Sequence, residues 1–245
     1  MLRPLAIALG FLTRLPVRTG PVEPRELGHA LTWFPVVGVV LGAALIGAQR
    51  VLGDRLAPGL GAVALVAGLA GASGGLHLDG FADVFDALGG GRGDRRRMLA
   101  IMRDSRIGAH GAAALVLLLA AKLAAVGEVL GHGPAWAVFA CPVAARWAVV
   151  PLVVWFPYVR PDGLGKAFHG HAGVGQVVGA TLWCALAIGW LGTHAVVAAA
   201  IALGAALGLA VWLQRRLGGL TGDVYGAAIE LAELAFVTAA GLSAR

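Results

Sequence analysis

Charged residues are scarce in this chain of 245 residues, at 13% of the sequence, whereas hydrophobic residues make up 59%. A soluble domain of this length carries about twice that charged fraction. The composition therefore excludes a soluble domain. Cysteine is also scarce, and Cys141 and Cys184 both lie in apolar segments. Their spacing suits neither a disulfide framework nor a cysteine metal site, so we expect them to serve packing.

Two further features are missing. No nucleic-acid-binding module is recognisable, so the net charge of +6 does not indicate a nucleic-acid partner. Residues 1–17 lack a small-residue cleavage site, and Arg14 and Pro16 interrupt their short apolar run. A removable signal is therefore not expected, and an interfacial or re-entrant helix is the prediction for this segment.

Long apolar runs recur along the whole chain. They predict an all-α integral membrane protein, with about seven transmembrane helices in one polytopic domain, residues 1–245. The predicted spans are 31–50, 57–78, 108–130, 135–156, 174–192, 195–213 and 224–243. The 38 glycines fit close helix packing in lipid rather than a disordered linker.

The basic residues are distributed unevenly between the two sides of this topology. With the N-terminus inside, the inside segments hold Arg3, Arg14, Arg18, Arg25, Arg92, Arg95, Arg96, Arg97, Arg103, Arg106, Arg160, Lys166, Arg215 and Arg216. The outside segments hold only Arg50, Arg55 and Arg245. This bias predicts that the polar segments 77–106, 158–171 and 215–223 all face the cytoplasm. One cytoplasmic site built from these segments is the simplest interpretation.

Three aspartates lie within the apolar run 75–88. Asp79, Asp83 and Asp86 stand at i, i+4 and i+7, just after His77, so a helix would place them on one stripe. Such carboxylates repel one another and are costly beside lipid, so they need a partner. A divalent cation with oxygen ligands, Mg²⁺ above all, fits them. The alternative is a solvated helix end, with His77 as a hydrogen-bonded interfacial residue rather than a ligand or base.

A second polar segment precedes the third span. Asp104 and Ser105 are favourable residues for a helix N-cap, and Arg103 and Arg106 flank them. A helix N-terminus beside two arginines suits a phosphate group. The alternative is an ordinary capped helix whose arginines only orient the membrane topology.

The last span carries acidic residues that require a reason. Asp223, Glu230 and Glu233 lie at i, i+7 and i+10, near one helical stripe. Glu230 and Glu233 either take part in function or form a structural polar network with Lys122 or Arg146, whereas Asp223, at the boundary of the loop, is expected to be functional. Arg146 itself lies within the fourth span, where it either pairs with an acid or holds a substrate phosphate.

The segment 157–171 is rich in glycine, and it contains Lys166 and two histidines. It either closes over a phosphorylated ligand or is a solvated loop.

These motifs, taken in order, resemble those of cobalamin synthase, the adenosylcobinamide-GDP ribazoletransferase family of integral membrane enzymes. The resemblance runs nearly end to end. It is carried by Phe-Leu-Thr-Arg-Leu-Pro-Val at 11–17, His-Leu-Asp-Gly-Phe-Ala-Asp at 77–83, Asp-Ser-Arg-Ile-Gly at 104–108 and Gly-Gly-Leu-Thr-Gly-Asp at 218–223. Val84 and Ala87 stand where the family often has Thr and Gly.

The resemblance implies a reaction. The phosphocobinamide moiety of adenosylcobinamide-GDP is transferred to the 5′-hydroxyl of α-ribazole, or of α-ribazole 5′-phosphate. The products are adenosylcobalamin, or its 5′-phosphate, and GMP, with Mg²⁺ as cofactor. The implied location is the bacterial cytoplasmic (inner) membrane, in contact with lipid and without nucleic acid, and a homo-oligomer is left open.

On the matching positions we expect Asp79, Asp83 and Asp86 to bind Mg²⁺. Asp83, Asp104 and Asp223 are the predicted catalytic residues. The predicted substrate-binding residues are His77, Ser105, Arg106, Arg146, Lys166 and Thr221.

Two other functions remain as alternatives. A Mg²⁺-dependent phosphotransferase of the CDP-alcohol type has similar aspartate spacing. The fuller motif of that class, with Ala-Arg after the first aspartates and a later Gly-x-x-x-Asp-x-x-x-Asp, is not present in this sequence. A cation transporter would place its carboxylates near the middle of the bilayer, often in inverted repeats. Here the acidic residues are predicted at one face, and no convincing repeat is visible.

Overall fold

The computed structural model describes residues 2–243, apart from the side chains of residues 2 and 54. Its α-helices are α1 (Leu2–Leu12), α2 (Pro24–Ala30), α3 (Phe34–Leu52), α4 (Pro58–Ser73), α5 (Leu76–Gly90), α6 (Arg95–Ile101), α7 (Ala109–His132), α8 (Trp136–Trp155), α9 (Leu164–Gly170), α10 (Val174–Ile188), α11 (Thr193–Leu217) and α12 (Gly222–Leu242). Short 3-10 helices occupy Leu31–Trp33, Gly53–Arg55 and Gly189–Leu191.

Six helices of the described chain are long and apolar enough to cross a membrane, and the bent pair α4–α5 makes up to seven. A shorter apolar helix lies near the N-terminus, within α1. The prediction of an all-α membrane protein with about seven spans is therefore confirmed.

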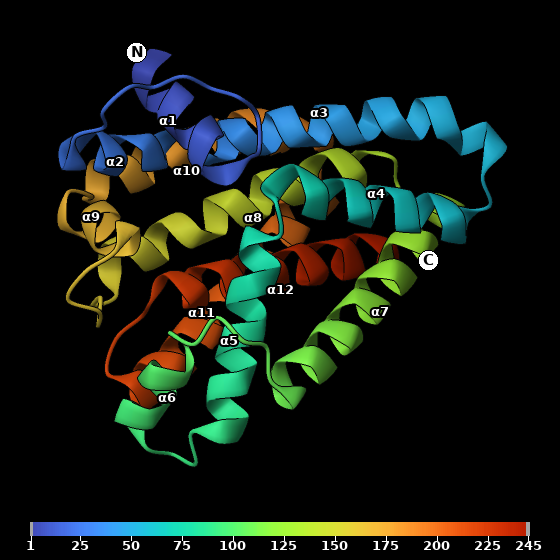
Figure 1. The fold of residues 1–245 in the computed structure, drawn as a ribbon. Coiled ribbons are helices and arrows are strands. Elements are labelled where there is room, and N and C mark those ends of the chain that lie inside the picture. The colour runs from blue at the N-terminus through green and yellow to red at the C-terminus, as the bar shows by residue number, and fades with distance from the viewer. Residues whose placement is uncertain (1, 244–245) are drawn as a thin grey trace.

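Helices α8 and α12 form the centre of the bundle, and they are its most buried spans (Figure 1). Helix α3 packs directly on α8 through Gly38 and Gly42. A Cβ atom at position 42 would lie 2.2 Å from the carbonyl oxygen of Phe139. Small residues four positions apart thus let the two backbones touch, which is a common mode of helix association in lipid.

The second predicted span, 57–78, is wrong in one respect. We expect the aspartate stripe to continue this span, but α5 turns away from α4 by 90° (Figure 1). Gly74 and Gly75 cause the break, because their φ angles of 63° and 74° are left-handed and cannot continue a right-handed helix. The aspartates therefore belong to a separate helix, which packs against α12 and α7.

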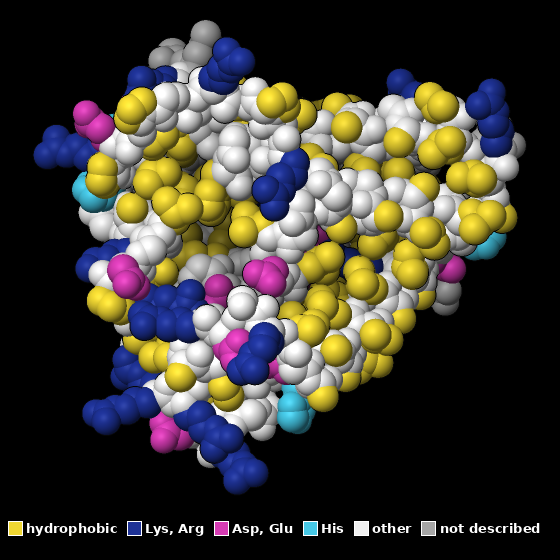
Figure 2. All heavy atoms as spheres, viewed as in Figure 1, with side chains coloured by type: hydrophobic (Ala, Val, Ile, Leu, Met, Phe, Trp, Pro, Cys, Tyr) yellow, Lys and Arg dark blue, Asp and Glu magenta, His cyan; other side chains and the backbone are white. Residues whose placement is uncertain are grey.

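Basic side chains gather at one end of the molecule. Figure 2 shows Lys and Arg mainly on the side where α2, α5, α6 and α9 lie, whereas few are visible where α3 meets α4. The polar segments singled out in the sequence are found at this same basic end. The end therefore has the charge expected of a positive-inside surface.

Candidate active site

One cavity of about 540 Å³ opens at the basic end of the bundle. Its walls come from α1, α3, α5, α8, α9 and α12, together with Leu31 and residues 102–103 and 158–163. Figure 2 shows acidic side chains beside a hollow on this face, with arginines next to them. The structure thus joins the three polar segments, 77–106, 158–171 and 215–223, around one cavity.

The carboxylates of the site meet where α5 crosses the start of α12. A Cβ atom at Gly80 would lie 2.7 Å from the carbonyl oxygen of Asp223 and 2.9 Å from its Cα, so the two backbones are in contact. This contact brings the carboxylates of Asp79, Asp83 and Asp223 close enough to repel one another. Asp79 and Asp223 line the cavity, and Asp83 stands one turn further along α5.

Arg160 is the cation of this cluster. Its Nη2 donates to Asp223 Oδ2 at 2.5 Å and to the carbonyl oxygen of Met102 at 3.0 Å. A short backbone bridge holds it in place, because Val159 N donates to Leu220 O at 2.9 Å and Leu220 N donates to Pro157 O at 2.7 Å. The bridge fastens the loop after α8 to the loop before α12.

The sequence interpretation pointed to the segment around Arg160 but not to this residue. An arginine just after a membrane span is explained equally well by topology, so its role depends on the partner that the fold supplies. Tyr225 also lines the cavity and was not among the predicted site residues, whereas Arg103, one of the two arginines expected beside a phosphate, does line it.

Asp86 also lies on α5, but its carboxylate contacts the start of α7 instead of the other three charged residues. It is buried, and its two carboxylate oxygens accept hydrogen bonds from Gly108 N at 2.7 Å and Gly111 N at 2.8 Å. These amides belong to the start of α7, whose first N–H groups have no partner within the helix. Asp86 therefore anchors α7 to α5, and the predicted stripe of three carboxylates divides between two tasks.

The loop before α7 is exposed. Asp104 accepts hydrogen bonds from Arg106 Nη2 at 2.7 Å and Nε at 3.0 Å, and Arg106 lowers the pKa of the Asp104 carboxyl to about 2. Asp104, Ser105 and Arg106 do not line the cavity, whereas the neighbouring Arg103 does. A carboxylate with so low a pKa is a weak base.

Two other predicted residues border the cavity without lining it. Thr221 is buried and caps α12, because its Oγ1 accepts a hydrogen bond from Val224 N at 3.4 Å and lies 3.3 Å from Asp223 Oδ2. Lys166 is on α9, where its Nζ donates to the carbonyl oxygen of Pro161. Thr221 thus orients the helix start that carries Asp223.

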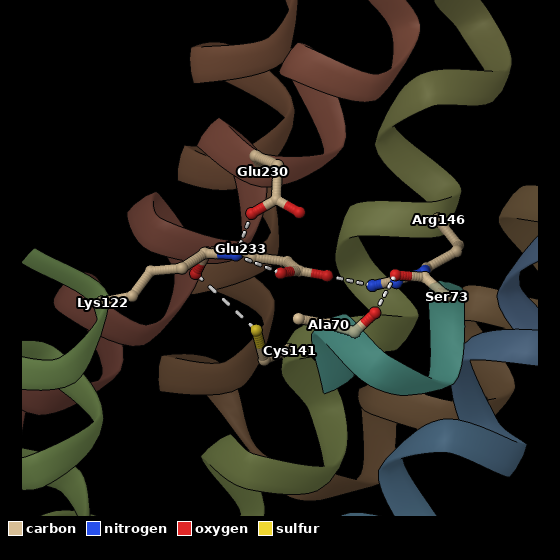
Figure 3. A network of polar contacts seen from close by, with 7 residues as sticks. All are labelled: Ala70, Ser73, Lys122, Cys141, Arg146, Glu230 and Glu233. Atoms are coloured by element: carbon tan, nitrogen blue, oxygen red, sulfur yellow. Dashed lines mark hydrogen bonds and ion pairs between the residues drawn. The ribbon is translucent and has the colours of Figure 1, made fainter. Parts of the chain in front are cut away.

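Arg146 belongs to a second charged cluster, deep in the bundle (Figure 3). Glu233 lies between two cations, with Lys122 Nζ at 2.5 Å on one side and Arg146 on the other, and Lys122 also pairs with Glu230. All four side chains are buried. The structural network that the sequence left open for the two glutamates is therefore what the structure shows.

His77 lies between the two charged regions. It is 2% exposed, it lines the 540 Å³ cavity, and it also lines a smaller cavity of about 50 Å³ beside the buried network. Its Nε2 is buried without a hydrogen-bond partner among the described residues. Such an atom is costly unless water or a ligand satisfies it.

Comparison with known proteins assigns the chain to one family. The family model for cobalamin-5-phosphate synthase matches residues 4–241. The chain belongs to the cobalamin-5-phosphate synthase family.

Curated relatives are similar to this chain over nearly their whole length. Adenosylcobinamide-GDP ribazoletransferase of Pseudomonas paraeruginosa is 42% identical over 98% of this chain and 98% of the relative. The protein with the same name from Ectopseudomonas mendocina is 44% identical over 97% of this chain and 98% of its own. No solved structure matches the chain.

The carboxylate oxygens at the α5–α12 crossing are of the type that a hard divalent cation prefers. In the part of the chain that the structure describes, no three carboxylate, imidazole or thiolate groups lie close enough to hold a metal ion by themselves. Mg²⁺ does not require such a cage, since it is usually bound by one or two carboxylates, several waters and the phosphates of a substrate. Asp79, Asp83 and Asp223 therefore fit a Mg²⁺ that binds together with a diphosphate.

Proposed function

We propose that this chain is an adenosylcobinamide-GDP ribazoletransferase of the bacterial inner membrane, with its active site facing the cytoplasm. It joins adenosylcobinamide-GDP to α-ribazole, or to α-ribazole 5′-phosphate, and releases GMP. Similarity over nearly the full length to proteins of that name supports the proposal. The observation that carries it is the meeting of Asp79, Asp83 and Asp223 at the α5–α12 crossing, beside a cavity that is large enough for a nucleoside.

The reaction breaks a phosphoanhydride bond and forms a phosphate ester. The 5′-hydroxyl oxygen of the acceptor forms a bond to the phosphorus nearer cobinamide, and the bond from that phosphorus to the bridging oxygen breaks. GMP leaves with the bridging oxygen and its electron pair, and the hydroxyl proton passes to a base. Such a transfer needs charge neutralisation on the phosphates and an in-line arrangement of the attacking and leaving oxygens.

Asp79, Asp83 and Asp223 would hold Mg²⁺, which when bound neutralises charge on the diphosphate. Arg160 and Arg103 are placed to contact phosphate oxygens at the cavity mouth, where planar guanidinium groups bind such oxygens well. Asp83 and Asp223 are the candidates for the proton acceptor. Arg106, Ser105 and Lys166 stay predictions, because they flank the cavity rather than line it.

Several predicted roles change in the light of these contacts. Asp86 is not carried forward as a metal ligand, because both of its oxygens already bind the α7 amides. Arg146 is not carried forward as a phosphate contact, since it is fully buried and paired with Glu233. Asp104 is not carried forward as the base, because its pKa is about 2. Thr221 acts through the cap that orients Asp223.

The proposal is tested with purified protein in nanodiscs, supplied with adenosylcobinamide-GDP and α-ribazole. We expect release of GMP and formation of a cobamide in equal amounts, dependent on Mg²⁺ and lost when EDTA is added. Substituting a CDP-linked alcohol for the donor should give no product. Turnover that is unaffected by EDTA would remove the metal assignment, and product from the CDP-linked donor alone would favour the other phosphotransferase class.

A further inference from the structure

The cavity changes character from its mouth to its inner end. Along α12 it is lined by Asp223, Tyr225, Gly226 and Ile229. Ile229 lies six positions after Asp223, which corresponds to about 9 Å along the helix. The charged groups of the site lie at the first of these positions. Toward Ile229 the walls are apolar, with Val149 and Val153 of α8 facing the cavity.

Aromatic rings form part of the apolar wall. Phe11 of α1, Phe34 of α3 and Phe168 of α9 all line the cavity and pack on one another. Their ring centroids are 4.8 Å apart for Phe11 and Phe168, 5.8 Å for Phe34 and Phe168, and 6.2 Å for Phe11 and Phe34. A flat apolar group that enters the cavity would therefore meet ring surfaces rather than flexible chains.

The cavity wall contains buried polar atoms without a hydrogen-bond partner among the described residues, two of them on Tyr225 and His77. The Tyr225 hydroxyl belongs to a side chain that is 8% exposed, and His77 Nε2 to one that is 2% exposed. Both residues line the cavity, and a Cβ atom at Gly226 would lie 3.2 Å from the Cα of His77, so they occupy neighbouring levels of α12 and α5. Buried polar atoms of this kind indicate a ligand that supplies a small number of hydrogen bonds.

We propose that this apolar recess, formed by Phe11, Phe34, Val149, Val153, Tyr225 and Ile229, binds the heterocyclic base of the acceptor nucleoside. The inference rests on the proposed function and adds which substrate occupies which end of the cavity. The base of α-ribazole is a dimethylbenzimidazole, a flat ring with two methyl groups and one free ring nitrogen. Its ring lies against the apolar wall, and its free nitrogen accepts a hydrogen bond from the Tyr225 hydroxyl.

The other parts of the substrates fit the recess poorly. The guanine of the donor has several donors and acceptors on its edge, and most of them would be buried without partners. The corrinoid of the donor is larger than the cavity and has to remain outside its mouth. With the base in the recess, the ribose points to the charged end, where its 5′-hydroxyl meets Asp223.

The test measures acceptor selectivity. Steady-state rates of GMP release are compared for α-ribazole and for the corresponding α-nucleoside of adenine, whose amine and ring nitrogens would lack partners. We expect kcat/KM to favour α-ribazole by about 100-fold in the native protein, the effect of burying one or two unpaired polar groups. Val153→Thr adds a hydroxyl to the recess at nearly constant volume and should narrow this ratio at least fivefold.

A second variant separates the two substrates. Tyr225→Phe keeps the ring and removes the unpaired hydroxyl, so it should lower kcat/KM for α-ribazole about 10-fold, mainly through KM, while KM for adenosylcobinamide-GDP stays the same. A larger KM for the donor with an unchanged KM for α-ribazole would overturn the assignment, as would an unchanged base preference in Val153→Thr. Absence of GMP release by the native protein with either nucleoside would instead count against the proposed function.

Discussion

Beside the cavity, a cluster of three carboxylates has one arginine, which pairs with Asp223, whereas inside the bundle two carboxylates pair with two cations. The mouth cluster of Asp79, Asp83, Asp223 and Arg160 is only partly buried, and it borders a cavity. The buried network of Lys122, Arg146, Glu230 and Glu233 is almost fully enclosed (Figure 3).

This difference separates the roles of the two regions. A balanced set of ion pairs satisfies its own charges within the membrane and requires no ligand. A set with excess negative charge is stabilised by a cation from outside, and Mg²⁺ can bind such a set together with the phosphates of a substrate. Charge balance thus distinguishes the helix-joining network from the candidate catalytic cluster.

The largest expected effect is on activity at the mouth cluster. Asp83→Asn removes one negative charge with little change in shape, and we expect GMP release to fall at least about 10³-fold because charge stabilisation on the phosphates is lost. The protein should remain folded, as judged by its thermal unfolding in detergent.

Asp94→Asn is the matched control for this substitution. Asp94 caps α6 by accepting hydrogen bonds from Arg96 N and Arg97 N, and asparagine is an equally good N-cap. The control should keep normal activity. An Asp83→Asn protein with near-normal turnover would show that the mouth cluster does not stabilise the reaction.

The second effect is on stability in the buried network. Glu233→Leu leaves Arg146 without its carboxylate and removes one of the two partners of Lys122. We expect the free energy of unfolding in mixed detergent micelles to fall by about 3–5 kcal/mol, since an unpaired buried charge remains. The double variant Glu233→Leu, Arg146→Leu should lose less than the single one.

Activity measured on the folded fraction of Glu233→Leu distinguishes the two regions further. A balanced network that only joins helices predicts nearly normal GMP release per folded molecule. If stability were unchanged while turnover disappeared, the buried network would have to be counted as part of the active site.

The smallest effect is expected at Asp86. Asp86→Ala leaves Gly108 N and Gly111 N without their acceptors, which should cost about 2 kcal/mol of unfolding free energy. GMP release should fall less than 10-fold, far less than for Asp83→Asn. A loss of activity equal to that of Asp83→Asn, with unchanged stability, would return Asp86 to the set of metal ligands.

Much of the architecture could be read from local patterns. The membrane class and the spans follow from stretches of apolar residues, because transfer into lipid depends on the composition of each segment. The polar segments of the site were also recognisable from the sequence, because charged residues beside a membrane span need a partner. Asp79, Asp83 and Asp223 were all predicted as site residues on this basis.

The hydrogen-bond and ion-pair partners of these residues could not be predicted from local sequence patterns. Periodicity places Asp83 and Asp86 on one helix face, yet one carboxylate joins the mouth cluster and the other binds α7. Arg160 follows a predicted span, and Arg146 lies within one. In the folded protein Arg160 pairs with Asp223 and Arg146 pairs with Glu233. These outcomes depend on which helices cross at Gly80 and on the 90° turn at Gly74 and Gly75. Hydropathy is a property of a segment, whereas an ion pair is a property of two segments that meet only when the chain has folded.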